Sequence, residues 1–268
     1  MTVTKKAYAK INLTLEILGT KRGDGFHDIA SVMMKVPHLY DKVTVTLTEK
    51  SISVKCDRDV CDEKDNLAYR AVCEFAELYR EKYGKTVGAS VVIKKNIPMG
   101  AGLAGGSADC AAVIDALSEL TEGITAEEKQ RIAESLGSDI PFCLEAHTVS
   151  LCEGRGEIIT DLPSLEGVEI KVIKPEMPLF TKGIYSEYDN LYGDDYTKSK
   201  SIKMAELIRN KADINEILSL MCNDFQSICE KRCPEITSAC KVLEEEGYFS
   251  QMSGSGSAVF GIKAVQRS

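Results

Sequence analysis

The sequence NIPMGAGLAGGSAD, residues 96–109, places four glycines and Ser107 directly ahead of a segment with a helical pattern. Glycine tolerates positive φ angles and has no Cβ to hold a ligand away, so consecutive backbone N–H groups can converge on an anion. A helix that begins at Ser107 would add the positive end of its dipole. The stretch therefore predicts a phosphate-binding loop, and the simpler alternative is that the glycines only form a tight bend.

Two widespread phosphate loops fit this stretch poorly. Gly100, Gly102 and Gly105 formally match the GxGxxG pattern of dinucleotide-binding proteins. That pattern requires a βαβ unit with an acidic residue at the end of the next strand, whereas two predicted helices follow here. A Walker A loop requires a lysine directly before the serine, where this chain has Gly106. The sequence thus favours a phosphate loop of another kind.

Two further stretches carry candidate catalytic side chains. Apolar residues alternate over 7–17, which predicts a strand whose other face carries Lys10 and Asn12. The stretch GSDIPF presents Asp139 just after a predicted helix. An aspartate near a lysine stays ionised and can accept a proton from a hydroxyl, while the lysine offsets charge on a phosphoryl group. Taken singly, Lys10 could be a solvated charge and Asp139 a turn former.

The hydrophobic pattern predicts strands and helices mixed without regular βαβ order, which is typical of an α+β fold. Asp65 is the expected N-cap of the first helix, and Thr125 with Glu128 the capping box of another.

The polar, tyrosine-rich segment 178–200 is expected to join domains or to face a substrate. Two lobes are expected, residues 1–160 and 161–268. The predicted strands are 7–17, 43–49, 51–56, 87–95, 148–154, 168–175, 248–252 and 258–262; the predicted helices are 66–79, 107–120, 126–136, 203–209, 214–229 with a break, and 234–246.

The composition excludes several classes of protein. With 268 residues and a formal net charge of -8, the chain is not a general binder of nucleic acid. No apolar run approaches the roughly 20 residues that cross a bilayer, and we expect a cytoplasmic protein without a membrane partner. The ten cysteines form no CxxC pair and have no histidine at zinc spacing, which indicates reduced thiols and no protein metal site. The oligomeric state is not predicted.

Four stretches in this order, AKINL, PMGAGLAGGSAD, GSDIPF and MSGSGSAVFG, resemble the GHMP small-molecule kinases. The resemblance implies a two-lobed α+β fold, with a ribosomal protein S5 domain 2-like N-terminal lobe and a ferredoxin-like C-terminal lobe. GDGFH, KDNLAYRA and CEGRGEII are similar to the branch of this family that phosphorylates the 2-hydroxyl of 4-diphosphocytidyl-2-C-methyl-D-erythritol in non-mevalonate isoprenoid biosynthesis. Another GHMP kinase, of homoserine or mevalonate type, and a non-catalytic ATP-binding relative are the alternatives.

The resemblance also implies roles for particular residues. Asp139 would be the base and Lys10 its electrostatic partner, and Mg²⁺ would bridge the phosphate oxygens of ATP with no protein ligand assigned. This chain has Ala108 where relatives often have a second serine. It also stops sooner than most, so the C-terminal sheet is expected either to lack an edge or to be completed by another element. The substrate-binding residues would be Asn12, Phe26, His27, Tyr185 and Gly254. The ATP-binding residues would be Asn66, Lys95, Pro98, Met99, Gly100, Ala101, Gly102, Leu103, Ala104, Gly105, Gly106 and Ser107.

Overall fold

The computed structural model describes residues 1–19, 27–58, 61–176, 181–192 and 200–265, and the chain forms two compact units. Each unit is built from separated stretches of chain. The predicted division at residue 160 follows chain order instead, and it remains a prediction. Unit 1 consists of Met1–Ala9, Val36–Met99 and Ala104–Ala146, and unit 2 of Lys10–Lys35, Gly100–Leu103 and His147–Ser268.

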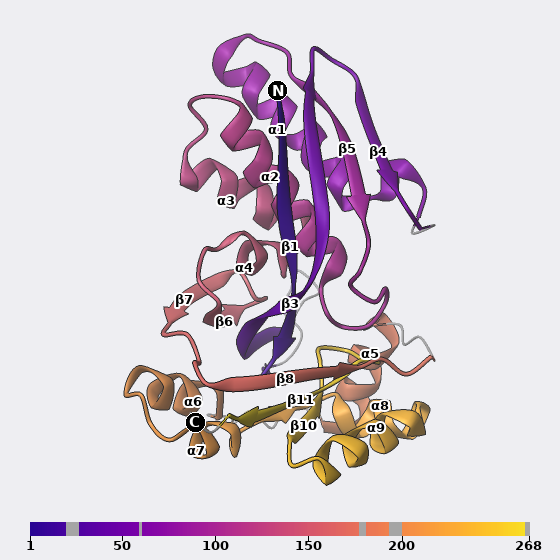
Figure 1. The fold of residues 1–268 in the computed structure, drawn as a ribbon, viewed down its shortest axis with the longest axis vertical. Helices are drawn as coiled ribbons and strands as arrows, with labels where there is room; N and C mark the ends of the chain where they lie inside the picture. The colour runs from indigo at the N-terminus through magenta and orange to yellow at the C-terminus, as the bar shows by residue number, and fades with distance from the viewer. Residues whose placement is uncertain (20–26, 59–60, 177–180, 193–199, 266–268) are drawn as a thin grey trace. The chain divides into compact units, whose positions relative to one another are not determined.

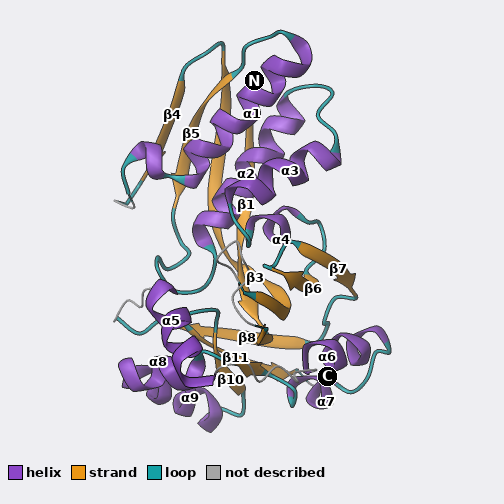
Figure 2. Cartoon of the chain, turned by 180° about the vertical axis from the view of Figure 1, so that it is seen from behind, coloured by secondary structure: helices purple, strands orange, loops and turns teal. Residues whose placement is uncertain are grey.

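Unit 1 is a sheet covered on one face by helices (Figure 2). Its strands follow the order β4-β5-β3-β1, in which β4 and β5 run parallel and β5 runs antiparallel to β3. Val45 pairs with Val91, and both side chains are buried. The strands are β1 Thr2–Asn12, β3 Asp28–Thr48, β4 Ile52–Cys56 and β5 Gly88–Lys94; β1 and β3 continue into unit 2. The helices are α1 Leu67–Tyr83, α2 Gly105–Leu120, α3 Ala126–Leu136 and α4 Ile140–Leu144, after the short 3-10 turn Glu63–Asp65.

The starts of the unit 1 helices correct two predictions and confirm one. Asn66, not Asp65, is the N-cap of α1, because its side chain accepts the N–H of Ala68 at 2.9 Å. Helix α2 begins at Gly105, two residues before the predicted Ser107. Thr125 forms the predicted capping box of α3 with Glu128.

Unit 2 contains a three-stranded sheet in the order β10-β11-β8, with α8 and α9 beside it (Figure 1). The central strand β11 is antiparallel to both neighbours. The strands of unit 2 are β2 Thr14–Leu18, β6 Val149–Gly154, β7 Ile158–Leu162, β8 Val168–Ile173, β9 Cys222–Asn223, β10 Phe249–Met252 and β11 Val259–Ala264. Its helices are α5 Thr181–Tyr192, α6 Lys200–Arg209, α7 Ile214–Leu218, α8 Gln226–Arg232 and α9 Pro234–Glu245.

Several elements of unit 2 differ from the predicted pattern. The predicted strand 7–17 is interrupted at Leu13, which gives β1 and β2, and the Leu13 N–H donates to the carbonyl of Val32. The break predicted within helix 214–229 is present as the two-residue strand β9, where Cys222 pairs with Thr14 of β2. Strand β7 and helix α5 were not predicted.

The core of unit 2 joins β2 to the helices. Ile17, Ile184, Phe225, Ile228 and Met252 belong to one cluster of buried apolar side chains. Burial of these side chains from distant parts of the chain gives the unit its stability. None of the described helices is long and apolar enough to cross a membrane.

Glu16 is a buried carboxylate that holds the start of α6. Its oxygens accept the N–H groups of Lys200 and Ser201 at 3.2 and 2.7 Å, and the Ser201 hydroxyl at 2.6 Å. Charge-assisted hydrogen bonds at a helix N-terminus are among the stronger ones. The polar face that carries Lys10 and Asn12 therefore also carries a structural residue.

We predict that Glu16→Ala lowers the free energy of unfolding by about 2 kcal/mol, because it leaves the buried N–H of Ser201 without its acceptor. Urea denaturation measures the change. Glu206→Ala, on the exposed side of the same helix, is the control and should be within about 0.5 kcal/mol of the parent protein. Equal stability of the two variants would show that Glu16 does not hold α6.

Candidate functional site

The glycine stretch has a backbone that side chains rarely allow. Gly100, Gly102 and Ala104 have φ angles of +59°, +74° and +54°, so every second residue lies in the left-handed region. Gly100 is exposed, whereas Ala101 and Leu103 are buried. The loop therefore anchors its apolar side chains and alternates them with glycines.

Residues 100–103 belong to unit 2, where other residues donate hydrogen bonds to their carbonyl groups. The N–H of Lys10 donates to the carbonyl of Leu103 at 3.1 Å, and the N–H of Ala258 donates to the carbonyl of Ala101 at 3.1 Å. The Ser253 hydroxyl donates to the carbonyl of Gly102 at 3.0 Å. The AKINL strand and the SGSGS turn thus both support the glycine stretch.

Gly102 and Gly254 are required by this close approach. A Cβ on Gly102 would lie 2.1 Å from the carbonyl oxygen of Ser253. A Cβ on Gly254 would lie 3.0 Å from the carbonyl oxygen of Gly102 and 3.5 Å from Oδ1 of Asn12. The structure therefore brings Gly254, Asn12 and Gly102 together, and their role in binding a substrate or ATP remains a prediction.

The second half of the stretch opens helix α2 in unit 1. Ala104 is the N-cap, and it offers no side-chain acceptor to the first N–H groups. Helix α2 carries no acidic residue in its first turn. Gly105, Gly106 and Ser107 form that turn, so their unpaired N–H groups and the helix dipole favour an anion.

Lys10 and Asn12 form a buried polar chain at the end of β1. The Lys10 ammonium donates to Oδ1 of Asn12 at 2.8 Å, and Asn12 donates through Nδ2 to the Ser31 hydroxyl at 2.8 Å. Lys10 is 4% exposed and Asn12 1%. The hydrogen bonds hold the two side chains in fixed positions beside the backbone that carries Leu103.

Asp139 lies at the N-cap position of α4 in unit 1, where it is partly buried. Its side chain makes no capping hydrogen bond to α4. Helix α4 packs against α2, so the aspartate and the anion-binding turn belong to the same unit. Lys10 belongs to unit 2, and its pairing with Asp139 remains a prediction.

His27 and Tyr185, two of the predicted substrate-binding residues, lie together in unit 2. Their ring centroids are 5.5 Å apart with an interplanar angle of 26°. Nε2 of His27 is 2.7 Å from Oδ1 of Asp189, and Tyr185 packs edge-on against Phe225. The imidazole is thereby oriented by a residue of α5 that the sequence did not single out. Phe26 lies outside the described residues.

Lys95 and Asn66 are engaged within unit 1. The Lys95 ammonium contacts Asp41 at 2.5 Å and Asp109 at 2.6 Å, and all three side chains are buried. Asn66 caps α1 and also lies 3.7 Å from Sγ of Cys56. Both were predicted to bind ATP, and that role remains a prediction. Asp41 and Asp109 were not predicted: no local pattern marks Asp41, and Asp109 ends the glycine motif but was given no role.

Comparison with known proteins identifies the family. The models for the GHMP kinases N terminal domain and the GHMP kinases C terminal match residues 66–146 and 204–264. The chain is 36% identical to the 4-diphosphocytidyl-2-C-methyl-D-erythritol kinase of Clostridium acetobutylicum over 258 residues, which cover 95% of this chain and 89% of the relative. The chain belongs to the GHMP kinase family. The predicted resemblance is thus confirmed.

Two solved structures are similar to this chain in fold. A solved 4-(cytidine 5'-diphospho)-2C-methyl-D-erythritol kinase superposes with a TM-score of 0.78 at 27% identity, covering 98% of this chain and 91% of that one. The homoserine kinase of Cytophaga hutchinsonii gives a TM-score of 0.73 at 16% identity, covering 99% and 86%, which is evidence for the fold alone. The predicted α+β GHMP fold is confirmed.

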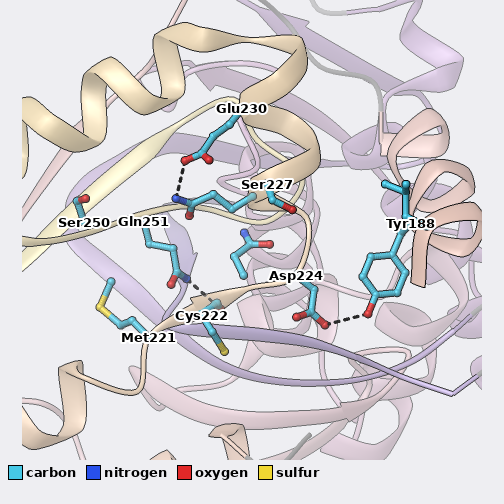
Figure 3. A pocket seen from close by; sticks show the side chains of 11 residues that line it. Tyr188, Met221, Cys222, Asp224, Ser227, Glu230, Ser250 and Gln251 are labelled. Atoms are coloured by element: carbon cyan, nitrogen blue, oxygen red, sulfur yellow. Dashed lines mark hydrogen bonds between the residues drawn. The ribbon is translucent and has the colours of Figure 1, made fainter. Parts of the chain in front are cut away.

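Unit 2 of this GHMP kinase also contains an open cavity of about 760 Å³, between α5, α8 and β10 (Figure 3). None of the predicted site residues within the described chain lines it. Its polar groups serve the protein itself: Gln251 donates to the carbonyl of Asn12, and Asn223 to that of Gly254. Asp224 accepts the N–H of Ile17. Residues of the cavity wall therefore hold the backbone of two predicted site residues, Asn12 and Gly254.

We predict that Gly102→Ala lowers the free energy of unfolding by about 3 kcal/mol, because the methyl group would meet Ser253 and φ is positive. Gly100→Ala is the matched control. Its φ is also positive, but nothing lies within 4 Å of the added Cβ, so it should cost about 1 kcal/mol. Urea denaturation of both variants measures the difference. Equal losses would contradict the close contact.

Proposed function

We propose that this GHMP kinase transfers the γ-phosphoryl group of ATP to the 2-hydroxyl of 4-diphosphocytidyl-2-C-methyl-D-erythritol. The similarity to 4-diphosphocytidyl-2-C-methyl-D-erythritol kinases supports this assignment, since it extends over nearly the whole chain. The observation that carries it is the position of His27 beside Tyr185, because a flat base such as cytosine can stack on the tyrosine ring while the histidine bonds its edge.

The nucleotide phosphates would lie along residues 100–107. The N–H groups at the start of α2 provide donors there, and the helix dipole adds a favourable field. Magnesium that arrives with ATP would neutralise charge on the phosphate oxygens. We assign no side chain to it.

Asp139 would act as the base for the acceptor hydroxyl. It belongs to the unit that carries the first turn of α2. Lys10 would offset the charge that moves onto the transferred group, and Asn12 would hold the polyol. The hydrogen bond between Lys10 and Asn12 keeps both groups oriented, so that catalysis proceeds by positioning and electrostatics.

The cytosine base would stack between two aromatic rings, those of Phe26 and Tyr185, and His27 would bond the edge of the base. Asp189 accepts from Nε2 of His27, which leaves Nδ1 for a hydrogen bond with the base. Tyr185 is supported from behind by Phe225. These contacts explain why a histidine rather than any turn residue would be useful at position 27.

We predict that Asp139→Asn lowers kcat by about 100-fold or more while ATP still binds, because the amide cannot accept the proton. A coupled assay of ADP formation with the cytidyl substrate measures kcat, and calorimetry measures ATP binding. Asp115→Asn, an exposed carboxylate in the same unit, should retain the parent kcat. An unchanged kcat in Asp139→Asn would remove Asp139 from the mechanism.

We predict that His27→Ala raises KM for the cytidyl substrate by about tenfold and leaves KM for ATP unchanged, since the variant removes a hydrogen bond and a ring contact with the base. The same ADP assay measures both constants. His147→Ala, an exposed histidine paired with Asp161, is the control. If KM for the cytidyl substrate stays the same, the cytosine site lies elsewhere.

A further inference from the structure

A buried charge cluster in unit 1 consists of Asp41, Lys95 and Asp109. The Lys95 ammonium lies 2.5 Å from Oδ2 of Asp41 and 2.6 Å from Oδ2 of Asp109. The side chains are 4%, 0% and 5% exposed for Lys95, Asp41 and Asp109. One ammonium group thus serves two carboxylates away from water.

Asp41 holds the backbone just before the glycine stretch. Its Oδ1 accepts the N–H groups of Asn96 and Ile97 at 2.5 and 2.8 Å. Since Oδ2 accepts from Lys95, both oxygens of Asp41 are engaged. Asp41 therefore fixes the path of the chain as it leaves β5.

Lys95 lies beneath the first turn of α2. A Cβ on Gly105, the first residue of that helix, would be 3.4 Å from the Lys95 ammonium and 3.1 Å from Cγ2 of Ile97. Asp109, one turn further along α2, holds the same ammonium. The cluster thus links the end of β5 to the start of α2, on either side of residues 100–104.

Burying the carboxyl group of Asp109 to hold Lys95 costs free energy. Its Oδ1 is buried without a hydrogen-bond partner among the described residues. Burial raises the pKa of Asp109 to about 7, although Lys95 acts to lower it, and Asp41 adds to the rise. The thiols of Cys56 on β4 and of Cys110 are the other titratable groups that interact with it.

Stability alone does not account for Asp109. Without it, Lys95 and Asp41 would remain a neutral pair, and an apolar side chain of similar shape is often no worse than a buried charge. A buried polar atom without a partner is rare in folded proteins. Both considerations indicate that Asp109 serves the candidate phosphate site at the first turn of α2.

We propose that Asp109 is a positioning residue of the nucleotide site, which fixes Lys95 and through it the first turn of α2. In this position the N–H groups of Gly105, Gly106 and Ser107 keep the direction that a phosphate group requires. The inference rests on the proposed function, because that function takes these groups as the ATP contact. It assigns Lys95 a supporting role in place of a side-chain contact with ATP.

The test compares Asp109→Leu with Asp109→Asn in the full-length chain. Leucine has the branching of aspartate but no acceptor for Lys95, so KM for ATP should rise about tenfold, with kcat and KM for the alcohol within about threefold of the parent values. Asparagine keeps an acceptor oxygen, so it should restore KM for ATP to within about threefold. Direct binding of magnesium-ATP, measured by calorimetry, should follow the same order.

Asp115→Leu is the matched control, since Asp115 lies on the same helix and is partly exposed beside Lys5 and Lys129. It should leave KM for ATP unchanged. The inference is overturned if Asp109→Leu has the parent KM for ATP, or if Asp109→Asn is as impaired as Asp109→Leu. If the parent protein itself neither binds ATP nor phosphorylates the cytidyl substrate, the proposed function fails instead.

Discussion

Hydrogen bonds hold the backbone just before residues 100–107 and within them, and the candidate site depends on this constraint. Asp41 accepts the N–H groups of Asn96 and Ile97, which come before residue 100. Ser253 and Ala258 donate to the carbonyl groups of residues 102 and 101. With the carbonyl groups occupied in this way, the loop adopts positive φ at alternate residues. A loop with a fixed conformation needs little reorganisation before it binds a phosphate group.

The same arrangement explains the use of charge. Phosphoryl transfer requires little covalent chemistry from the protein, so catalysis depends on placing donors and charges where the phosphate group reacts. Lys10 is oriented by Asn12, and Lys95 by Asp41 and Asp109. Lys95 is held by two buried carboxylates, which suits it to a supporting role.

Local patterns predicted much of this protein, and contacts between distant residues account for what they missed. Helix α3 was predicted with its capping box, since Thr125 and Glu128 are only three residues apart. The start of α2 was predicted two residues late, because Ala104 takes a left-handed conformation that alanine rarely adopts. Asp41 could not be associated with Lys95 and Asp109, because only the packing of β3, β5 and α2 brings them together.

The position of the nucleotide tests the central claim most directly. A crystal structure of the full-length chain with magnesium and a non-hydrolysable ATP analogue would show it. We expect phosphate oxygens within about 3.2 Å of backbone nitrogens between Gly100 and Ser107, with Asp139 facing the terminal phosphate. A triphosphate bound away from this stretch, or an Asp139 that faces away from it, would contradict the account.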